Sequence, residues 1–440
     1  MLRLLLLPCE GQSGITPPSI KLGTCYILRH IYKGQAMPIT TGLSGNEIYC
    51  LQLKGFTPGN IVVGNSVYSL GLLRSIGTGF KSIIGGELQH VTKLIEEGRE
   101  IAYQRMLKEA EIAKASGITG VSSELIFHGS NIEFLSIGSM VFSNNSKTSN
   151  PFSTSANGQE LFAQLDAGYQ PICFAFGNVA YSMGIGRGFI GALKTLGRGE
   201  IKEYSDLYNR TRHLALERII DHAKQHQANA VLGIKTTILP FIGTNEMLMI
   251  GTASRNPSLP TQSTQQIVTS DLTNIEMWNL ATLGYAPLRL LLGSSVYSLG
   301  IVGGLTSVVK SFVRGEINEL TRMIYDAREN ALALINEEAQ AIGAHDVVGV
   351  NTYVYQLGGG LIEFLAIGTA VQKINLPTES STMPAQAIIV DRNTFYSSMN
   401  SSVDVSGSGR INRANIGSII VPIIIITILF IYFLIKLFMS

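Results

Sequence analysis

The sequence predicts an α+β fold in which three tandem two-layer β-α-β-β modules are followed by a single C-terminal transmembrane helix. Two observations carry this prediction. One motif recurs in three places, as GNSVYSLG from Gly64, GNVAYSMG from Gly177 and GSSVYSLG from Gly293. One long apolar segment, IGSIIVPIIIITILFIYFLIKLF, occupies residues 416–438. Repetition of this kind is typical of a chain built from copies of one structural unit.

Length and composition limit the classes of protein that fit. The chain has 440 residues, more than a single compact core of usual size accommodates. The net charge of +2 gives no basic excess, so nucleic acid is not an expected partner. The four cysteines are far apart and contain no CxxC pair, so neither a disulfide framework nor a thiolate zinc site is predicted.

The residues around the motif keep their register with it in all three copies. A glutamate precedes the motif at a fixed distance, and a second glutamate and an arginine follow it. The matching residues are Glu47, Glu160 and Glu276, then Glu87, Glu200 and Glu316, and finally Arg99, Arg212 and Arg328. Chance does not maintain such a register, so the chain is predicted to be a triplication.

The repeat divides the chain into segments. Modules are predicted at 45–142, 158–255 and 274–372. The segments between them, 143–157 and 256–273, are polar and rich in turn-forming residues, which is typical of flexible linkers. Residues 1–44 are predicted to be a loose N-terminal extension, and residues 373–415 a flexible tether.

Within one module the spacing of apolar residues changes along the chain from one typical of strands to one typical of a helix and back. In the first copy, GNIVVGNSVYSL indicates a strand, and a long helix is predicted from about Glu87 to Ala115, stopped by Gly117. ITGVSSELIF and NIEFLSIGSMVF, separated by HGS, predict a β-hairpin. One helix on a small antiparallel sheet is a two-layer α+β module. A module of this size buries little surface per residue, so self-association is expected.

The apolar segment 416–438 predicts a membrane anchor. As a helix it would be roughly 34 Å long, enough to cross the ~30 Å hydrocarbon layer of a bilayer. Its one charged residue, Lys436, lies near its end, and Arg410 and Arg413 precede it. Positive charge at that end favours a tail-anchored protein whose N-terminal bulk faces the cytoplasm. The lipid bilayer is accordingly an expected partner.

Several segments resemble the YbjQ family of small bacterial proteins. The resemblance rests on IGGELQHVTKLIEEGREIAYQRMLKEAEIAKASGITGVSSELIF in the first copy and on DARENALALINEEAQAIGAHDVVGVNTY in the third. The second copy departs from the pattern, with GRG in place of Gly-Gly and QANAVLGI at the strand entry. The resemblance implies a β-α-β-β fold, assembly into pentameric rings and a label as a heavy-metal-binding domain. It implies no established activity.

The recurring arginine is the main candidate for a functional role. It lies within an apolar stripe of each predicted helix, where an unpaired charge would cost several kcal/mol. The candidate partners are Glu133, Glu246 and Glu363 on the last strand and Glu47, Glu160 and Glu276 on the first. The glutamates at the helix starts, Glu87, Glu200 and Glu316, are about three turns away and are expected to interact with the helix dipole. An Arg–Glu pair that fixes assembly is the preferred interpretation, and an anion site is the alternative.

The histidines provide one candidate pair for a metal. His222 and His226 have the i, i+4 spacing that places two imidazoles on one helical face. The other copies do not repeat them, and no cysteine accompanies them in the sequence, so a solvated helix surface is the simpler interpretation. No cofactor is expected. No catalytic residues are predicted either, because no Ser–His–Asp or Cys–His order recurs.

These observations predict a non-enzymatic, ring-forming homo-oligomeric scaffold that is tail-anchored at a membrane. Five chains that stack three rings, or one larger ring, would accommodate three modules per chain. Two alternatives stay open. One is an oligomer that binds a metal or a small anion through the ring lumen or the repeated arginines. The other is a secreted bacterial effector inserted in a host organelle membrane.

Overall fold

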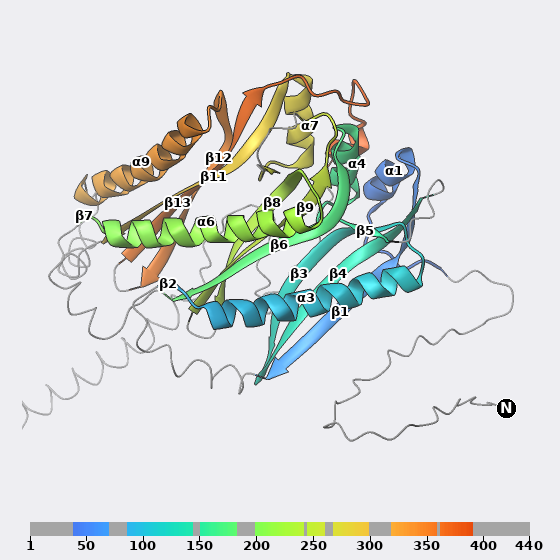
Figure 1. The fold of residues 1–440 in the computed structure, drawn as a ribbon, viewed down its shortest axis with the longest axis horizontal. Coiled ribbons are helices and arrows are strands. Elements are labelled where there is room, and N and C mark those ends of the chain that lie inside the picture. Colours follow the sequence, from blue (N-terminus) through green and yellow to red (C-terminus); the bar gives the residue numbers. More distant parts are fainter. Residues whose placement is uncertain are drawn as a thin grey trace, which may run out of the picture. The chain divides into compact units, whose positions relative to one another are not determined.

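Each described module combines an antiparallel sheet with a long helix (Figure 1). The computed structural model describes residues 38–69, 86–143, 150–182, 199–241, 244–259, 267–298, 318–358 and 361–389. The three modules belong to one compact unit, which begins at Ile39. The fold is therefore α+β, as the sequence predicts.

The three modules share one order of elements, except that no short strand is described before the long helix of module 3. Module 1 contains α1 (Gly45–Leu53), β1 (Phe56–Ser69), β2 (Gly86–Glu87), α3 (Gln89–Ile112), β3 (Gly117–His128) and β4 (Asn131–Ser143). Module 2 contains α4 (Gly158–Asp166), β6 (Gln170–Ser182), β7 (Gly199–Glu200), α6 (Lys202–Gln225), β8 (Ala230–Phe241) and β9 (Thr244–Arg255). Module 3 contains α7 (Asn274–Thr282), β11 (Tyr285–Ser298), α9 (Asn318–Ala341), β12 (Asp346–Gly358) and β13 (Leu361–Lys373).

A short helix that was not predicted opens each module. Ser44 and Thr273 form capping boxes with Glu47 and Glu276, and the Asn157 side chain caps α4. In each cap a side-chain oxygen accepts a hydrogen bond from a backbone N–H that the helix cannot satisfy itself. Glu47, Glu160 and Glu276 consequently lie in the first turns of these helices, not on the first strands.

Short strands join the sheets of neighbouring modules. Strand β2 of module 1 pairs with β6 of module 2, and β7 of module 2 pairs with β11 of module 3. The segments predicted as linkers contribute as well, because β5 (Phe152–Ser153) pairs with β3 and β10 (Val268–Thr269) pairs with β8. The described parts of both linkers are thus ordered by ladder hydrogen bonds with the preceding module.

Helices and sheets alternate through the unit. Helix α3 packs on β1 and β4 of its own sheet and on β6 of the next sheet, and α6 packs in the same way on β6, β9 and β11. Residues alternate between buried and exposed along much of β1, whereas β6 is buried without interruption over residues 173–181. A strand covered on both faces shows such a continuous buried run. Among the described elements, the sheets of modules 2 and 3 are therefore covered on both faces, and the sheet of module 1 on one.

The described part of the predicted tether folds back over the short helices. Helix α10 (Ala385–Ile388) contacts α1 and α4, where Cys50, Phe162 and Ala387 form an apolar cluster. The Gln159 amide donates a hydrogen bond to the Ile389 carbonyl. These contacts hold residues up to 389 against the unit.

The membrane predictions are corrected by one finding. Among the residues that the structure describes, no helix combines the length and the apolar character needed to cross a bilayer. The segment 416–438 itself lies outside the described residues, as do residues 1–37 of the predicted extension. The fold class of the described residues is accordingly three α+β modules without a membrane helix. The predicted membrane location is corrected on the same ground, whereas the lipid partner and the host-membrane effector find no support among the described residues.

Candidate functional site: the junctions between modules

The repeated position of the arginine is explained by the junction between modules 1 and 2. Arg99 of α3 donates through Nε to Glu246 Oε1 at 3.0 Å and through Nη2 to Glu246 Oε2 at 2.7 Å. Its Nη1 donates to the Ser123 hydroxyl and carbonyl of its own module. Both charged side chains are 0 % exposed. Glu246 lies on β9, so this two-pronged ion pair links module 1 to module 2.

The junction between modules 2 and 3 repeats this geometry. Arg212 of α6 donates through Nε to Glu363 Oε1 at 3.1 Å and through Nη2 to Glu363 Oε2 at 2.6 Å. The guanidinium also lies over the rings of Tyr181 and Tyr208. Burial disfavours its charge, but the Glu363 carboxylate outweighs this effect and raises the pKa of Arg212 above its ordinary value. Arg212 is thus held as a cation inside the protein.

The two buried arginines offer no site for a small anion. Every guanidinium nitrogen of Arg99 already donates to a protein acceptor, and the Arg212 nitrogens donate to Glu363 and to the Met247 sulfur. Because both are fully buried, an incoming anion would have to displace a bidentate carboxylate. The geometry is that of a structural joint.

Glutamates of the short helices form a second repeated link. Glu47 of α1 accepts a hydrogen bond from the Gly158 N–H at the start of α4, at 2.9 Å. Glu160 of α4 accepts one from the Asn274 N–H at the start of α7, at 2.5 Å. A carboxylate is favoured there because the first N–H groups of a helix have no intrahelical partner and carry partial positive charge. Each short helix is therefore tied to the next through its third residue.

At the two ends of the unit the same positions have no such partners. Arg328 of α9 is exposed and forms no ion pair with any described residue. Glu133 of β4, the equivalent of Glu246, binds the Asn65 amide and the His128 ring, and these hydrogen bonds lower its pKa. Three pairs were expected from the sequence, and one chain assembles two of them. The remaining arginine, Arg328, lies in module 3, and the remaining glutamate, Glu133, lies in module 1. The two are thus at opposite ends of the series of modules.

The glutamates predicted at the helix starts lie before the helices. Glu87 and Glu200 belong to the two-residue strands β2 and β7. Glu87 pairs with Arg218 of module 2 at 2.5 Å, and Glu200 accepts hydrogen bonds from Ser205 and from Asn330 of module 3. Each of the two glutamates therefore has one contact that crosses a module junction. Glu316 lies outside the described residues.

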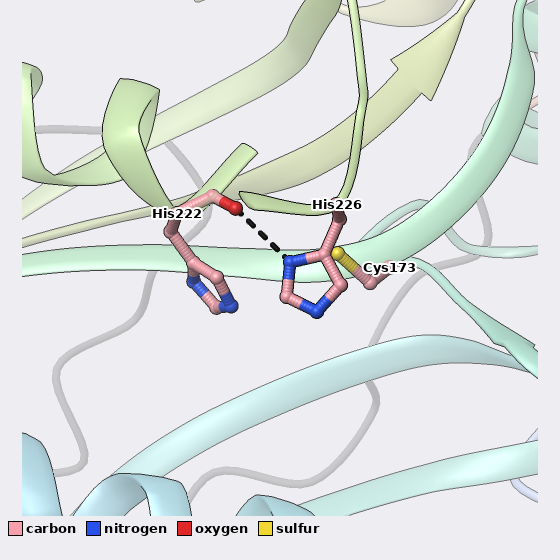
Figure 2. Close-up of side chains that lie close together, drawn as sticks. All are labelled: Cys173, His222 and His226. Carbon is pink, nitrogen blue, oxygen red and sulfur yellow. Dashed lines mark hydrogen bonds between the residues drawn. The ribbon is translucent and has the colours of Figure 1, made fainter. Parts of the chain in front are cut away.

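The histidine pair has a cysteine neighbour that the sequence order hides. Cys173 of β6 lies beside His222 and His226 at the end of α6, and their ligand atoms are all within 4.8 Å of one another (Figure 2). Cys173 is buried, His222 is half-buried and His226 is exposed. Thiolate and imidazole are the donors that zinc and related cations prefer. Among the described residues, this is the group whose chemistry fits a heavy-metal ion.

Comparison with known proteins agrees with the repeat. A family model described as "Putative heavy-metal-binding", YbjQ, matches residues 56–141, 169–256 and 285–374. The chain is 30% identical over 233 residues to an encapsulin nanocompartment protein of Mycobacterium tuberculosis, covering 49% of this chain and 85% of that protein.

Shorter relatives match one module at a time. A UPF0145 protein of Vibrio parahaemolyticus is 37% identical over 78 residues, which cover 18% of this chain and 74% of that protein. A UPF0145 protein of Pseudothermotoga lettingae is 46% identical over 61 residues, covering 14% of this chain and 58% of that protein. Three matched segments in one chain mean three tandem copies of the domain. The chain therefore belongs to the YbjQ family.

Proposed function

We propose that this protein is a non-enzymatic structural component that assembles head to tail with copies of itself into a closed ring. In this assembly, module 3 of one copy packs against module 1 of the next through the junction that already joins modules 1, 2 and 3. The observation that carries the proposal is the missing third ion pair between Arg328 and Glu133. A heterologous interface of this kind forms a ring when its rotation closes.

The uncovered face of module 1 supports the proposal. Val63 and Val67 of β1 are 44% and 58% exposed, whereas the equivalent Phe176 and Ala180 of β6 are 6% and 0% exposed. The difference arises because α3 covers β6 and no described helix covers this face of β1. A second copy would cover it with α9, whose Tyr325 is 61% exposed. Exposed apolar side chains beside an unpaired charge fit a partner that carries the complementary pair.

The short helices provide matching ends. Glu276 of α7 is exposed and caps its own helix, as Glu47 does in α1. Gly45, at the start of α1, is exposed as well and is the equivalent of Gly158, whose N–H binds Glu47. A second copy would therefore continue the series of glutamate links from α7 to α1. Similarity to a relative named as an encapsulin nanocompartment protein also supports self-assembly.

Charge reversal tests the proposed interface. Arg328→Glu and Glu133→Arg each place like charges together at the junction between copies. Sedimentation or mass measurement should show smaller particles for either variant than for the unchanged protein. An equal mixture of the two variants should reassemble into rings with an even number of copies, because alternating copies then place a carboxylate opposite a guanidinium at every junction. The double variant should assemble alone for the same reason.

Lys108→Glu is the matched control. Lys108 is an exposed residue of α3 that pairs with Glu111. Its reversal therefore changes the charge of module 1 outside the two surfaces that are proposed to meet between copies. This variant should keep the particle mass of the unchanged protein. Particles whose mass is insensitive to Arg328→Glu and Glu133→Arg, or an unchanged protein that is a monomer at all concentrations, would contradict the proposed assembly.

A further inference from the structure

We propose that Cys173, His222 and His226 bind one borderline-soft divalent metal ion, of the Zn²⁺ class, in module 2. The three side chains come from the strand β6 and from the last turn and C-cap of α6, so the packing of helix on sheet brings them together (Figure 2). One thiolate and two imidazoles are a donor set that such cations select over the oxygen-rich sites of Mg²⁺ and Ca²⁺.

Hydrogen bonds indicate which ring atoms are available. His226 Nδ1 lies 3.0 Å from the His222 carbonyl, a distance at which Nδ1–H donates and Nε2 is left for a ligand. This arrangement, with the other ring nitrogen bonded to a carbonyl, is usual for metal-binding histidines. His222 Nδ1 accepts a longer bond, 3.3 Å, from the Phe176 N–H. Coordination through Nε2 of His222 would move the ring proton to Nδ1 and break that bond, so metal uptake should change the Phe176 amide.

The surroundings favour a cation at this point. The histidines lie at the C-terminal end of α6, where the unsatisfied carbonyls give partial negative charge. The negative charge of Glu100 in module 1 interacts electrostatically with both Cys173 and His222. Binding would form a sulfur–metal bond, release the thiol proton to solvent and leave a charge that Glu100 helps to balance.

The ligands can approach one another without disturbing the core. Ligand atoms of a tetrahedral zinc site lie roughly 3.5 Å apart, given bonds of about 2.0–2.3 Å. The present spread, up to 4.8 Å, is larger. His226 is exposed and occupies the C-cap position, so its side chain can move toward Cys173 at little cost. Metal binding would therefore require mainly a movement of His226, whereas the buried Cys173 would stay in place.

The other modules use the same place differently, so the site does not follow from the family fold. Cys173 and His222 correspond to Arg289 and Glu338 in module 3, where the two side chains form an ion pair at 3.5 Å. In module 1 the equivalent of His222 is Glu109, which accepts a hydrogen bond from the Val63 N–H. The strand and helix positions therefore face each other in more than one module. Only module 2 fills them with soft metal ligands.

Cobalt substitution of the full chain tests the proposal. Co²⁺ is added to chelator-treated, reduced protein, and the near-ultraviolet charge-transfer band of a thiolate–cobalt bond is recorded together with released protons. The variant Cys9→Ser/Cys25→Ser/Cys50→Ser, which keeps Cys173 alone, should bind one Co²⁺ per chain with this band, and Zn²⁺ should displace it. Adding Cys173→Ser to this variant removes the last cysteine and should abolish the band.

His226→Ala is the second variant, because its side chain is exposed and its removal leaves the core intact. It should fold, as judged by an unchanged unfolding midpoint, and should bind Co²⁺ more weakly. Amide exchange of Phe176 should become faster on metal addition only when Cys173 is present. Absence of the charge-transfer band in the Cys173-only variant, or an unchanged affinity for Co²⁺ after His226→Ala, would overturn the assignment.

Discussion

Arg99 and Arg328 occupy equivalent positions in modules 1 and 3, but only Arg99 is buried. The difference comes from the neighbour: module 2 supplies Glu246 to Arg99, and the outer side of α9 has no further described module in the chain. A buried ion pair contributes little net stability over an apolar pair of similar shape. Removal of only one partner of the pair is costly, however, because it leaves an uncompensated charge inside the protein.

Arg99→Ala should therefore lower the free energy of unfolding by about 3–5 kcal/mol, through the unpaired Glu246. Arg99→Met combined with Glu246→Leu should cost less than either single change, because no charge is left buried. Urea unfolding followed by circular dichroism measures both.

Arg328→Ala is the matched control, at a dilution where copies do not associate. Its exposed side chain predicts an effect within about 0.5 kcal/mol. Equal losses for Arg99→Ala and Arg328→Ala would mean that burial of the guanidinium does not determine its contribution.

At this scale the sequence predicted which residue types meet but not which copies supply them. An arginine on an apolar helix face requires an acceptor, and a glutamate of the last strand is the partner that the structure gives to Arg99 and Arg212. Three equivalent glutamates were available, and a repeat provides no local signal that distinguishes its own copy from the next. Cys173 was missed beside His222 because the two are joined only by the packing of β6 against α6.

At the scale of elements, one glycine in the first strand of each module determines how closely the helix approaches. A Cβ on Gly64 would overlap the backbone of Ala102 and Met106 in α3, and a Cβ on Gly293 would overlap the Ala331 carbonyl of α9. The backbone of a helix cannot yield as a flexible side chain does. The glycine of the repeated motif is thus explained by close packing and not by turn formation.

Gly64→Ala should force α3 away from β1 and lower the free energy of unfolding by about 1–3 kcal/mol. Thermal unfolding should show a lower midpoint. Gly45→Ala is the control, at a dilution where copies do not associate, because a Cβ there meets nothing within 4 Å and alanine favours a helix more than glycine does. A stable Gly64→Ala protein would show that the helix and strand have room to separate.

Long elements were predictable and short ones were not. The predicted helix and hairpin of module 1 correspond to α3, β3 and β4, whose apolar periods extend over many residues. Helix α1 was read as part of a strand, although the capping pattern of Ser44 and Glu47 was present as a signal. Strands β5 and β10 have two residues each and depend on an edge of another module, so no local pattern indicates them.

At the scale of the whole molecule, consecutive modules of one chain repeat one heterologous junction. This arrangement supports a ring in which the three modules of a chain are neighbours, and it does not support a stack in which each module joins a different ring. Any closed ring of this kind contains a multiple of three modules. A ring of five, which the family resemblance implies for single-module chains, would therefore not fit the proposed head-to-tail assembly. Images of the particle that show one ring with a multiple of three modules would support this conclusion, and a stack of three rings would contradict it.

One buried carboxylate ties distant parts of the chain together. Asp166, at the end of α4, accepts hydrogen bonds from Lys54 after α1, from Trp278 of α7 and from Ser380 beyond β13. Burial alone would raise its pKa, but these donors outweigh burial and lower the pKa of Asp166 below its ordinary value. The stabilisation is therefore present above about pH 4, the unfolded value, and is lost as the pH falls through the folded value.

Asp166→Ala should consequently loosen the chain after residue 373 and destabilise the protein by about 3 kcal/mol at pH 7, because buried donors lose their acceptor. Limited proteolysis should cut residues 374–384 faster in this variant, and its stability deficit should shrink toward pH 3. Glu379→Ala removes the other carboxylate bound to Lys54, at 2.7 Å, but that carboxylate is 60% exposed. Its loss should cost under about 1 kcal/mol. Similar cleavage rates for the two variants would mean that Asp166 does not hold this segment in place.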